Sequence, residues 1–136
     1  MSEIEQTLSI IKPDAVERNL EDEIISIFKK NKLSVKENKK IHITKEEAAE
    51  FYKVHQSKPF YNDLCAYLAS GPIVVMVLEG NNAVAANRKI MGATNPKDAD
   101  ENTIRKLYGI SIDKNSVHGS DSPENAKKEI DFFFKN

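Results

Sequence analysis

Ile73-Val74-Val75-Met76-Val77-Leu78 is the stretch that decides the fold of this chain. It is a run of apolar residues, most of them β-branched, and it is shorter than an ordinary helix. It follows Gly71-Pro72, a pair that typically forms a turn. A strand that is apolar on both faces has to be covered on both faces by other elements. We therefore expect this strand at the centre of a sheet, and the run is far too short to span a bilayer.

A further strand is predicted at residues 7–11, on the N-terminal side of the central run. Leu8 and Ile10 lie on one face at period two, and the strand ends before Pro13. Lys12 has the same parity as Leu8 and Ile10, so its side chain is expected on the same side. A lysine in this place is either a solvated strand end or a charge directed into a site.

Residues 33–43 are predicted to form another strand. Their apolar residues share one parity but are interrupted by Glu37 and Lys39, which indicates an edge strand or a β-bulge. Lysines are frequent between residues 29 and 40. A solvated edge guarded by lysines explains them better than a nucleic-acid contact, because no aromatic residues are interleaved for base stacking.

Helical patterns predict the elements that cover the sheet. Thr44 precedes Glu47 by three residues, which is the spacing of a capping box. Ser122 is placed to cap a last helix with Pro123 in its first turn. Further helices are predicted at residues 21–30, 62–70 and 82–91, a polar loop at residues 92–102, and a short last strand at Val117. This order predicts one domain over residues 1–136 with an α+β fold, a ferredoxin-like sandwich in which helices cover a four-stranded antiparallel sheet.

Composition limits the classes of function. Charged residues make up 30% of the chain but balance to a net charge of −1, so a dedicated nucleic-acid or membrane binder is not expected and a polyanionic substrate would have to meet a local basic cluster. Cys65 is the only cysteine, which excludes an internal disulfide, and its apolar helical surroundings indicate packing. Glu3 and Glu5 stand where a signal peptide would be basic and then apolar. We therefore expect a cytoplasmic protein.

Asn115-Ser116-Val117-His118-Gly119-Ser120-Asp121-Ser122-Pro123 contains the candidate reactive group. Small neighbours leave the imidazole of His118 uncrowded, and Gly119 permits backbone angles that are closed to other residues. Imidazole is largely neutral at about pH 7 and is then a competent nucleophile that needs no separate base. Considered alone, a histidine in such a Gly/Ser-rich turn is more often only a turn residue.

The signature from Asn115 to Asp121 resembles the active-site signature of nucleoside diphosphate kinases, in which the histidine is transiently phosphorylated. Three other segments of the family are similar and occur in the right order: Ile11-Lys12-Pro13-Asp14, Gly92-Ala93-Thr94-Asn95-Pro96 and Thr103-Ile104-Arg105. The resemblance covers nearly the whole chain and reinforces the predicted fold. It implies a kinase that moves the γ-phosphate of a nucleoside triphosphate, mainly ATP, to nucleoside diphosphates by a ping-pong mechanism through a phosphohistidine on His118.

The resemblance also implies roles for individual residues. Tyr52, which otherwise suggests core packing, and Glu129 would orient His118, and Ser120 would link to Glu129. The residues implied for the phosphates and ribose are Lys12, Arg88, Thr94, Arg105 and Asn115, and those implied for the base are Phe60, Leu64 and Ile112. The arginines are forked donors suited to phosphate. Stacking and apolar contact are indifferent to the kind of base, so broad base specificity is expected.

Mg²⁺ is expected to arrive on the nucleotide phosphates, keeping most of its own waters. No carboxylate cluster or Cys/His spacing suggests a metal cage, and the Walker and glycine-rich kinase patterns are absent, so side chains must supply the phosphate cradle. Lys106-Leu107-Tyr108-Gly109 departs from the family pattern after Arg105. This departure affects the expected base contact of Ile112 more than the phosphate contacts.

The expected partners are nucleoside tri- and diphosphates and further copies of the chain, with no membrane partner. A hexamer is favoured and a tetramer is possible, with the basic edge near residues 33–43 as a plausible dimer contact. Two alternatives stay open from the sequence. One is a nucleotide-binding or regulatory module that has lost turnover, and the other is secondary nucleic-acid binding through the lysines of residues 29–40.

Overall fold

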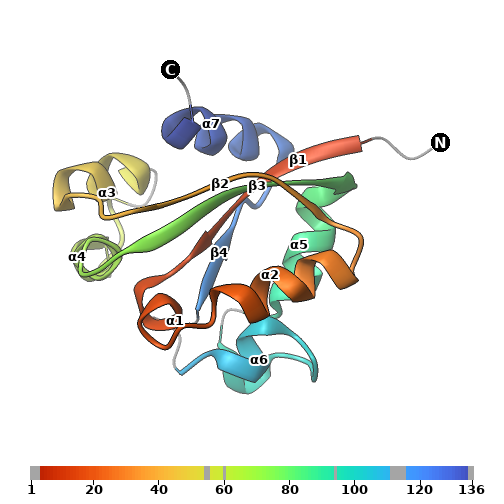
Figure 1. The fold of residues 1–136 in the computed structure, drawn as a ribbon. Coiled ribbons are helices and arrows are strands. Elements are labelled where there is room, and N and C mark those ends of the chain that lie inside the picture. The colour runs from red at the N-terminus through yellow and green to blue at the C-terminus, as the bar shows by residue number, and fades with distance from the viewer. Residues whose placement is uncertain (1–3, 54–55, 60, 94, 111–115, 135–136) are drawn as a thin grey trace.

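A four-stranded antiparallel sheet forms the middle layer of the molecule, as predicted (Figure 1). The computed structural model describes residues 4–53, 56–59, 61–93, 95–110 and 116–134. The strands are β1 (Ile4–Ile11), β2 (Ser34–Ile41), β3 (Ile73–Asn81) and β4 (Val117–Gly119). Their order across the sheet is β2-β3-β1-β4. The chain therefore brings its last strand, β4, next to its first.

The run at residues 73–78 is confirmed as a central strand. β3 pairs with β1 from Ile11 opposite Val74 to Ile4 opposite Asn81, and with β2 on its other side. All residues from Ile73 to Leu78 are buried. Burial on both faces is what a continuous apolar strand requires.

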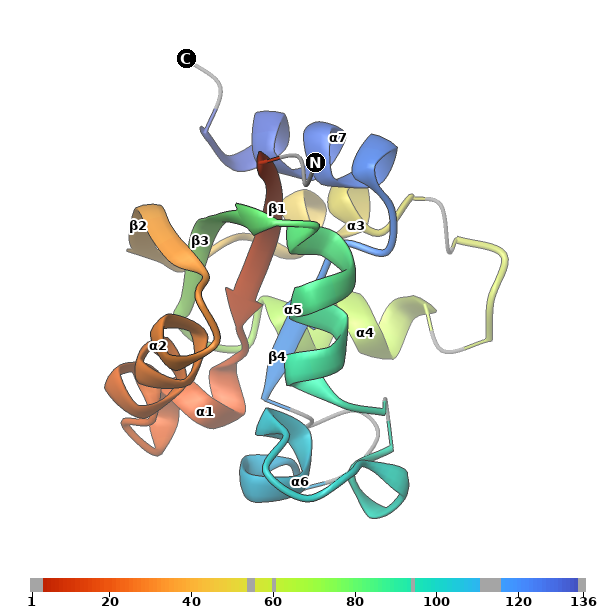
Figure 2. The same cartoon turned by 90° about the vertical axis from the view of Figure 1, so that its right-hand side faces the viewer.

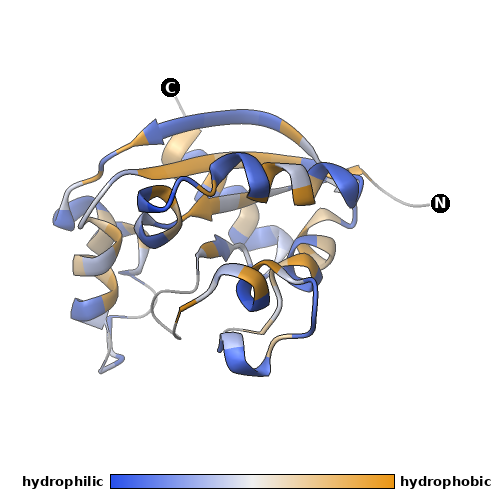
Figure 3. Cartoon of the chain, turned by 60° about the horizontal axis from the view of Figure 1, so that its bottom comes forward, coloured by the Kyte–Doolittle hydropathy of each residue, from blue (hydrophilic) through white to orange (hydrophobic). Residues whose placement is uncertain are grey.

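The edge position and the bulge predicted for residues 33–43 are both present. β2 is an edge of the sheet, and its register against β3 shifts between Val35 and Glu37. Figure 3 shows the contrast between the hydrophilic β2 and the hydrophobic β3. The lysines and glutamate of β2 thus lie along an exposed edge, where charged side chains prevent unwanted strand pairing.

Helices cover both faces of the sheet (Figures 1 and 2). On one face lie α1 (Pro13–Glu17), α2 (Glu21–Lys30), α5 (Ala83–Met91) and α6 (Ile104–Tyr108), and on the other lie α3 (Lys45–Phe51), α4 (Tyr61–Leu68) and α7 (Pro123–Phe134). β3 supplies both cores by alternation, with Val74 and Met76 in the first and Ile73 and Val75 in the second. Cys65 is buried in the second core, which confirms that it packs.

Both predicted helix starts are present. Thr44 and Glu47 form a complete capping box before α3, and the Ser122 hydroxyl accepts from the backbone N–H of Asn125 in α7 at 3.1 Å. The helix expected from residue 82 begins instead at Ala83, because Asn82 is left-handed with φ 49°. The loop expected at residues 92–102 contains a 3₁₀ turn, Pro96–Asp98.

Two short helices, α1 and α6, were not predicted. Each has five residues, which is too short to show an apolar period and too short to be stable alone. α1 starts at Pro13, whose fixed φ suits a first helical position. α6 starts after Thr103, whose hydroxyl accepts from the backbone N–H of Lys106 at 3.3 Å. Packing of Ala15, Val16 and Ile104 into the first core holds both helices in place.

Candidate active site

His118 lies in the middle of β4, opposite Ile10 of β1. Val117 is fully buried and anchors this short strand, as expected. Gly119 is required for a different reason from the predicted one. Its φ is not positive, but a Cβ at this position would lie 2.3 Å from Nδ2 of Asn87 and 2.7 Å from the methyl carbon of Met91. A side chain here would force Asn87 and Met91 to move, so glycine leaves room for β4 beside helix α5.

Glu129 of α7 faces His118 and contacts it directly, which the sequence had left open. Oε1 of Glu129 lies 3.0 Å from Nε2 of His118, and the buried Ser120 hydroxyl donates to the same oxygen at 3.0 Å. An ionised carboxylate only accepts hydrogen bonds, so in a neutral imidazole Nε2 carries the proton. The other ring nitrogen, Nδ1, then holds the lone pair.

Aromatic rings enclose the imidazole. The ring centroids of Phe51 and Tyr52 lie 5.4 and 6.2 Å from that of His118, both edge-on. Tyr52 is buried, and this burial, together with the nearby charge of Glu129, raises the pKa of its phenol well above the usual range. The phenol is therefore neutral beside the carboxylate. Phe51 was missed from the sequence, because it ends an amphipathic helix where an aromatic residue normally indicates core packing.

Two arginines lie near the histidine. Arg105 is 9% exposed and donates from Nη1 to the Gly92 carbonyl at 3.0 Å and from Nη2 to the Val117 carbonyl at 2.9 Å. Burial, and secondly the charge of Arg88, lowers the pKa of Arg105 to about 10, so it is still cationic at neutral pH. Arg88 is exposed. The bonds of Arg105 to backbone carbonyls were not predicted, since no local pattern specifies them.

Asp121 lies close to both Arg88 and His118. A hydrogen bond from Asn125 lowers the pKa of its carboxyl, and the nearby charges of Arg88 and His118 lower it further. Asp121 also lines a cavity of about 370 Å³ beside the imidazole. The other lining residues include Lys53, His118, Lys128 and Glu129. The cavity is thus lined by charges of both signs, with the lysines as its cationic groups.

Of the remaining predicted site residues, the structure describes Lys12 and Leu64. Lys12 is 5% exposed, so it is not a solvated strand end, and its backbone N–H donates to the Ser116 carbonyl at 2.8 Å. Leu64 packs against the second core. Phe60, Thr94, Ile112 and Asn115 lie outside the described residues.

Two further structural findings concern the described part of the chain. Within it, no three or more His, Cys, Asp and Glu side chains come together as a possible metal site. None of its helices is long and apolar enough to cross a membrane.

The fold is an α+β sandwich that presents a histidine held by a carboxylate, and comparisons with known proteins define its class. The chain belongs to the nucleoside diphosphate kinase family, whose sequence model matches residues 5–136, and it is a phosphotransferase. It is 60% identical over 131 residues to a nucleoside diphosphate kinase of Rhizorhabdus wittichii, covering 96% of this chain and 94% of that protein. It is 59% identical to one of Nitratiruptor, covering 96% of each.

Solved structures agree with this assignment. The nucleoside diphosphate kinase of Aquifex aeolicus superposes with a TM-score of 0.96 at 40% identity, over 98% of this chain and 97% of that one. The enzyme of Encephalitozoon cuniculi superposes with a TM-score of 0.94 at 39% identity, over 97% and 90% of the two chains. Fold and family are thus shown independently of the site geometry.

Proposed function

We propose that the protein transfers the γ-phosphate of a nucleoside triphosphate, mainly ATP, to nucleoside diphosphates by a ping-pong mechanism through a phosphohistidine on His118. One observation carries this proposal: the contact between Nε2 and Glu129 leaves the lone pair on Nδ1 in a half-buried histidine that lines a cavity. The Nδ1 lone pair attacks the γ-phosphorus, and the bond from that phosphorus to the bridging oxygen breaks. The diphosphate leaves with that oxygen. A second diphosphate then takes the phosphoryl group by the reverse step.

Glu129 acts on the charge that develops in this step. The imidazole becomes cationic as Nδ1 bonds to phosphorus, and the carboxylate 3.0 Å from Nε2 stabilises that cation. Ser120 holds the carboxylate in place by donating to the same oxygen. Tyr52 adds a neutral, buried wall. These groups work because they are already oriented before substrate binds.

The cationic residues act on the phosphates. Phosphoryl transfer depends on positioning and on stabilising the equatorial oxygens. Arg105 uses two of its five N–H groups for backbone carbonyls, and its Nε–H is buried, so one N–H group on each terminal nitrogen is left for other acceptors. Arg88 and Lys12 supply further positive charge, and Thr94 and Asn115 supply polar groups.

The nucleotide brings its own metal ion. Mg²⁺ is bound to the phosphates of the incoming nucleotide and is part of the substrate. Phe60, Leu64 and Ile112 hold the base by stacking and apolar contact, which accounts for acceptance of different bases. We place the enzyme in the cytoplasm as a homo-oligomer, a hexamer rather than a tetramer. Light scattering on the purified protein measures the number of subunits.

Labelling with ATP that carries the label in its γ-phosphate tests the mechanism. In the presence of Mg²⁺, we expect one acid-labile phosphate per chain, which a nucleoside diphosphate removes completely. The variant His118→Ala should take up no label. The matched control is His42→Ala, which removes an exposed histidine whose ring contacts the Ala69 carbonyl and should label normally. Label that is acid-stable, or that persists in His118→Ala, contradicts the mechanism.

A further inference from the structure

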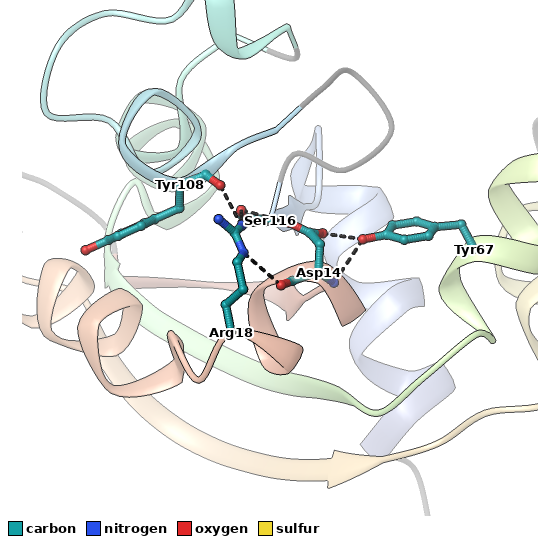
Figure 4. A network of polar contacts seen from close by, with 5 residues as sticks. All are labelled: Asp14, Arg18, Tyr67, Tyr108 and Ser116. Carbon is teal, nitrogen blue, oxygen red and sulfur yellow. Dashed lines mark hydrogen bonds and ion pairs between the residues drawn. The ribbon is translucent and has the colours of Figure 1, made fainter.

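A polar network surrounds Ser116, the residue just before β4 (Figure 4). Its centre is Asp14 of α1, whose side chain is 4% exposed. Tyr67 of α4 donates a short hydrogen bond to Oδ1 of Asp14 and accepts from its backbone N–H at 2.9 Å. The Ser116 hydroxyl donates to Oδ2 at 3.1 Å. Segments far apart in sequence are thus joined at one buried carboxylate.

Arg18, which directly follows α1, completes the network. Its Nη2 lies 3.2 Å from Oδ2 of Asp14 and 3.3 Å from the Ser116 hydroxyl, and it donates to the Tyr108 carbonyl at 2.6 Å. Its Nε donates to the Asp14 carbonyl at 3.0 Å. One nitrogen atom therefore connects Tyr108, which ends α6, with Ser116, which leads into β4. Ser116 itself has a left-handed backbone, φ 75°, which surrounding contacts must hold.

The network is adjacent to groups that the proposed function uses. Lys12 is two residues before Asp14, and its backbone N–H is bonded to the Ser116 carbonyl. Asn115 directly precedes Ser116 in the sequence, and His118 follows two residues later. A shift of Ser116 therefore changes the position of Lys12 relative to β4, while the contact between His118 and Glu129 is made by another helix and is not involved.

We propose that Arg18 is a positioning residue for the nucleotide. By joining Tyr108, Ser116 and Asp14, it holds the backbone of Lys12 against Ser116, the residue before β4. It thereby sets the affinity for the nucleotide without altering the reactivity of His118. This inference rests on the proposed function. Arg18 touches no reacting atom. Its effect is on the geometry of groups that contact substrate, where displacements of about 1 Å can change rates by up to about a hundredfold.

The variant Arg18→Met tests this role, because it keeps most of the apolar stem and removes the guanidinium. We compare two phosphoryl donors, ATP and phosphoramidate, which has no nucleoside to position. The KM for ATP should rise about tenfold while kcat and the rate of His118 phosphorylation by phosphoramidate stay within about twofold of wild type. Arg18→Lys, which keeps the charge on a shorter side chain, should recover part of the affinity.

Two further variants complete the design. Ser116→Ala removes the hydroxyl that accepts from Nη2 of Arg18, so it should raise the KM for ATP by a smaller factor. In combination with Arg18→Met it should add little. If Arg18→Met does not fold, the KM of Ser116→Ala tests the inference instead. Lys29→Met removes an exposed cation of α2 and should leave both donors unaffected. An unchanged KM, or equal loss with both donors, overturns the inference. Wild-type protein that neither donor phosphorylates at His118 overturns the proposed function itself.

Discussion

The two ends of the three-residue segment from Ser116 to His118 are built in opposite ways. At His118 the side chain is 23% exposed and one ring nitrogen is held by Glu129, which leaves the lone pair on the other ring nitrogen in the tautomer described above. At the other end, Asp14 has hydrogen-bond partners on both carboxylate oxygens, and Ser116 is fully buried. One end leaves an atom available for chemistry, and the other leaves none.

The difference shows how a small domain separates reactivity from support. A buried carboxylate without partners is strongly destabilising, so Asp14 has to be fully paired where it lies. A nucleophile that is fully paired cannot react, so the proposed role of His118 requires a partner on one nitrogen only. His118 follows Ser116 by only two residues. The contacts that hold Ser116 therefore also fix the position of His118. The following experiments perturb each end in turn.

Glu129→Gln should have the largest effect, at the reactive end. The amide keeps the shape but not the charge that stabilises the phosphorylated imidazole, so we expect His118 phosphorylation in a single turnover to slow about 10²-fold. Stability should change little. Glu124→Gln, an exposed position in the first turn of the same helix, is the control. Phosphorylation at the wild-type rate in Glu129→Gln would remove the carboxylate from the mechanism.

Arg105→Lys acts between the two ends, because Arg105 binds the carbonyl of Val117. A single ammonium nitrogen cannot reproduce the fork between Gly92 and Val117, so we expect about a tenfold loss of kcat/KM and a loss of about 2 kcal/mol in the free energy of unfolding. Arg88→Lys should lower kcat/KM without the loss of stability, since Arg88 is exposed. Equal stability of the two variants in urea would show that the hydrogen bonds of Arg105 to Gly92 and Val117 contribute nothing to the free energy of unfolding.

Tyr67→Phe affects the supporting end. It removes the hydroxyl that donates to Asp14 and accepts from its backbone N–H. The free energy of unfolding should fall by about 1.5 kcal/mol, because a buried carboxylate oxygen loses its partner. Tyr61→Phe removes one bond to the Ala49 carbonyl and should have a smaller effect. Urea unfolding of both variants measures the difference, and a larger effect at Tyr61 contradicts the ranking.

Asn125→Ala should have the smallest effect and the clearest pH dependence. Asn125 donates to Asp121 at 2.6 Å and lowers the pKa of that exposed carboxyl. Since the pKa is lower in the folded state, this bond stabilises at neutral pH and its contribution is lost as pH falls through the folded pKa. We expect the stability difference from wild type to change by about 0.5 kcal/mol between about pH 7 and about pH 3.

The same measurement in an Asp121→Asn background provides the control, because there the pH dependence should vanish. Comparing two pH values also removes the helix propensity of alanine, which is the same at both. A stability difference that does not vary with pH would assign the effect of Asn125 to the helix alone.

Much of the architecture was predictable because it is encoded in local patterns. The apolar run at residues 73–78 required a central strand, the charges of residues 37 and 39 indicated the irregular edge, and Thr44 with Glu47 specified a helix start. The predicted contact between His118 and Glu129 is present as well. These features follow from hydrophobic periodicity, capping chemistry and resemblance to a family, each of which is contained in a few adjacent residues or a known motif.

Other features were not predictable in this way. Arg18 and Tyr67 carry no motif, and they reach Asp14, Tyr108 and Ser116 across 53 to 98 residues of chain. Gly119 was expected to provide backbone freedom, whereas its role is to make room for Asn87. The helices α1 and α6 lack any apolar period of their own. In each case, the decisive neighbour is distant in sequence.

The sequence by itself determined the fold class, the family and the identity of the candidate nucleophile. Only the tertiary structure decided which imidazole nitrogen stays available, which carbonyls bind Arg105, and how Arg18 joins Tyr108 to Ser116. Local patterns fix what a segment can become, since burial and capping depend on neighbouring residues. Hydrogen bonds of about 3 Å depend on the packing of separate elements, and that packing is settled only when the whole chain folds.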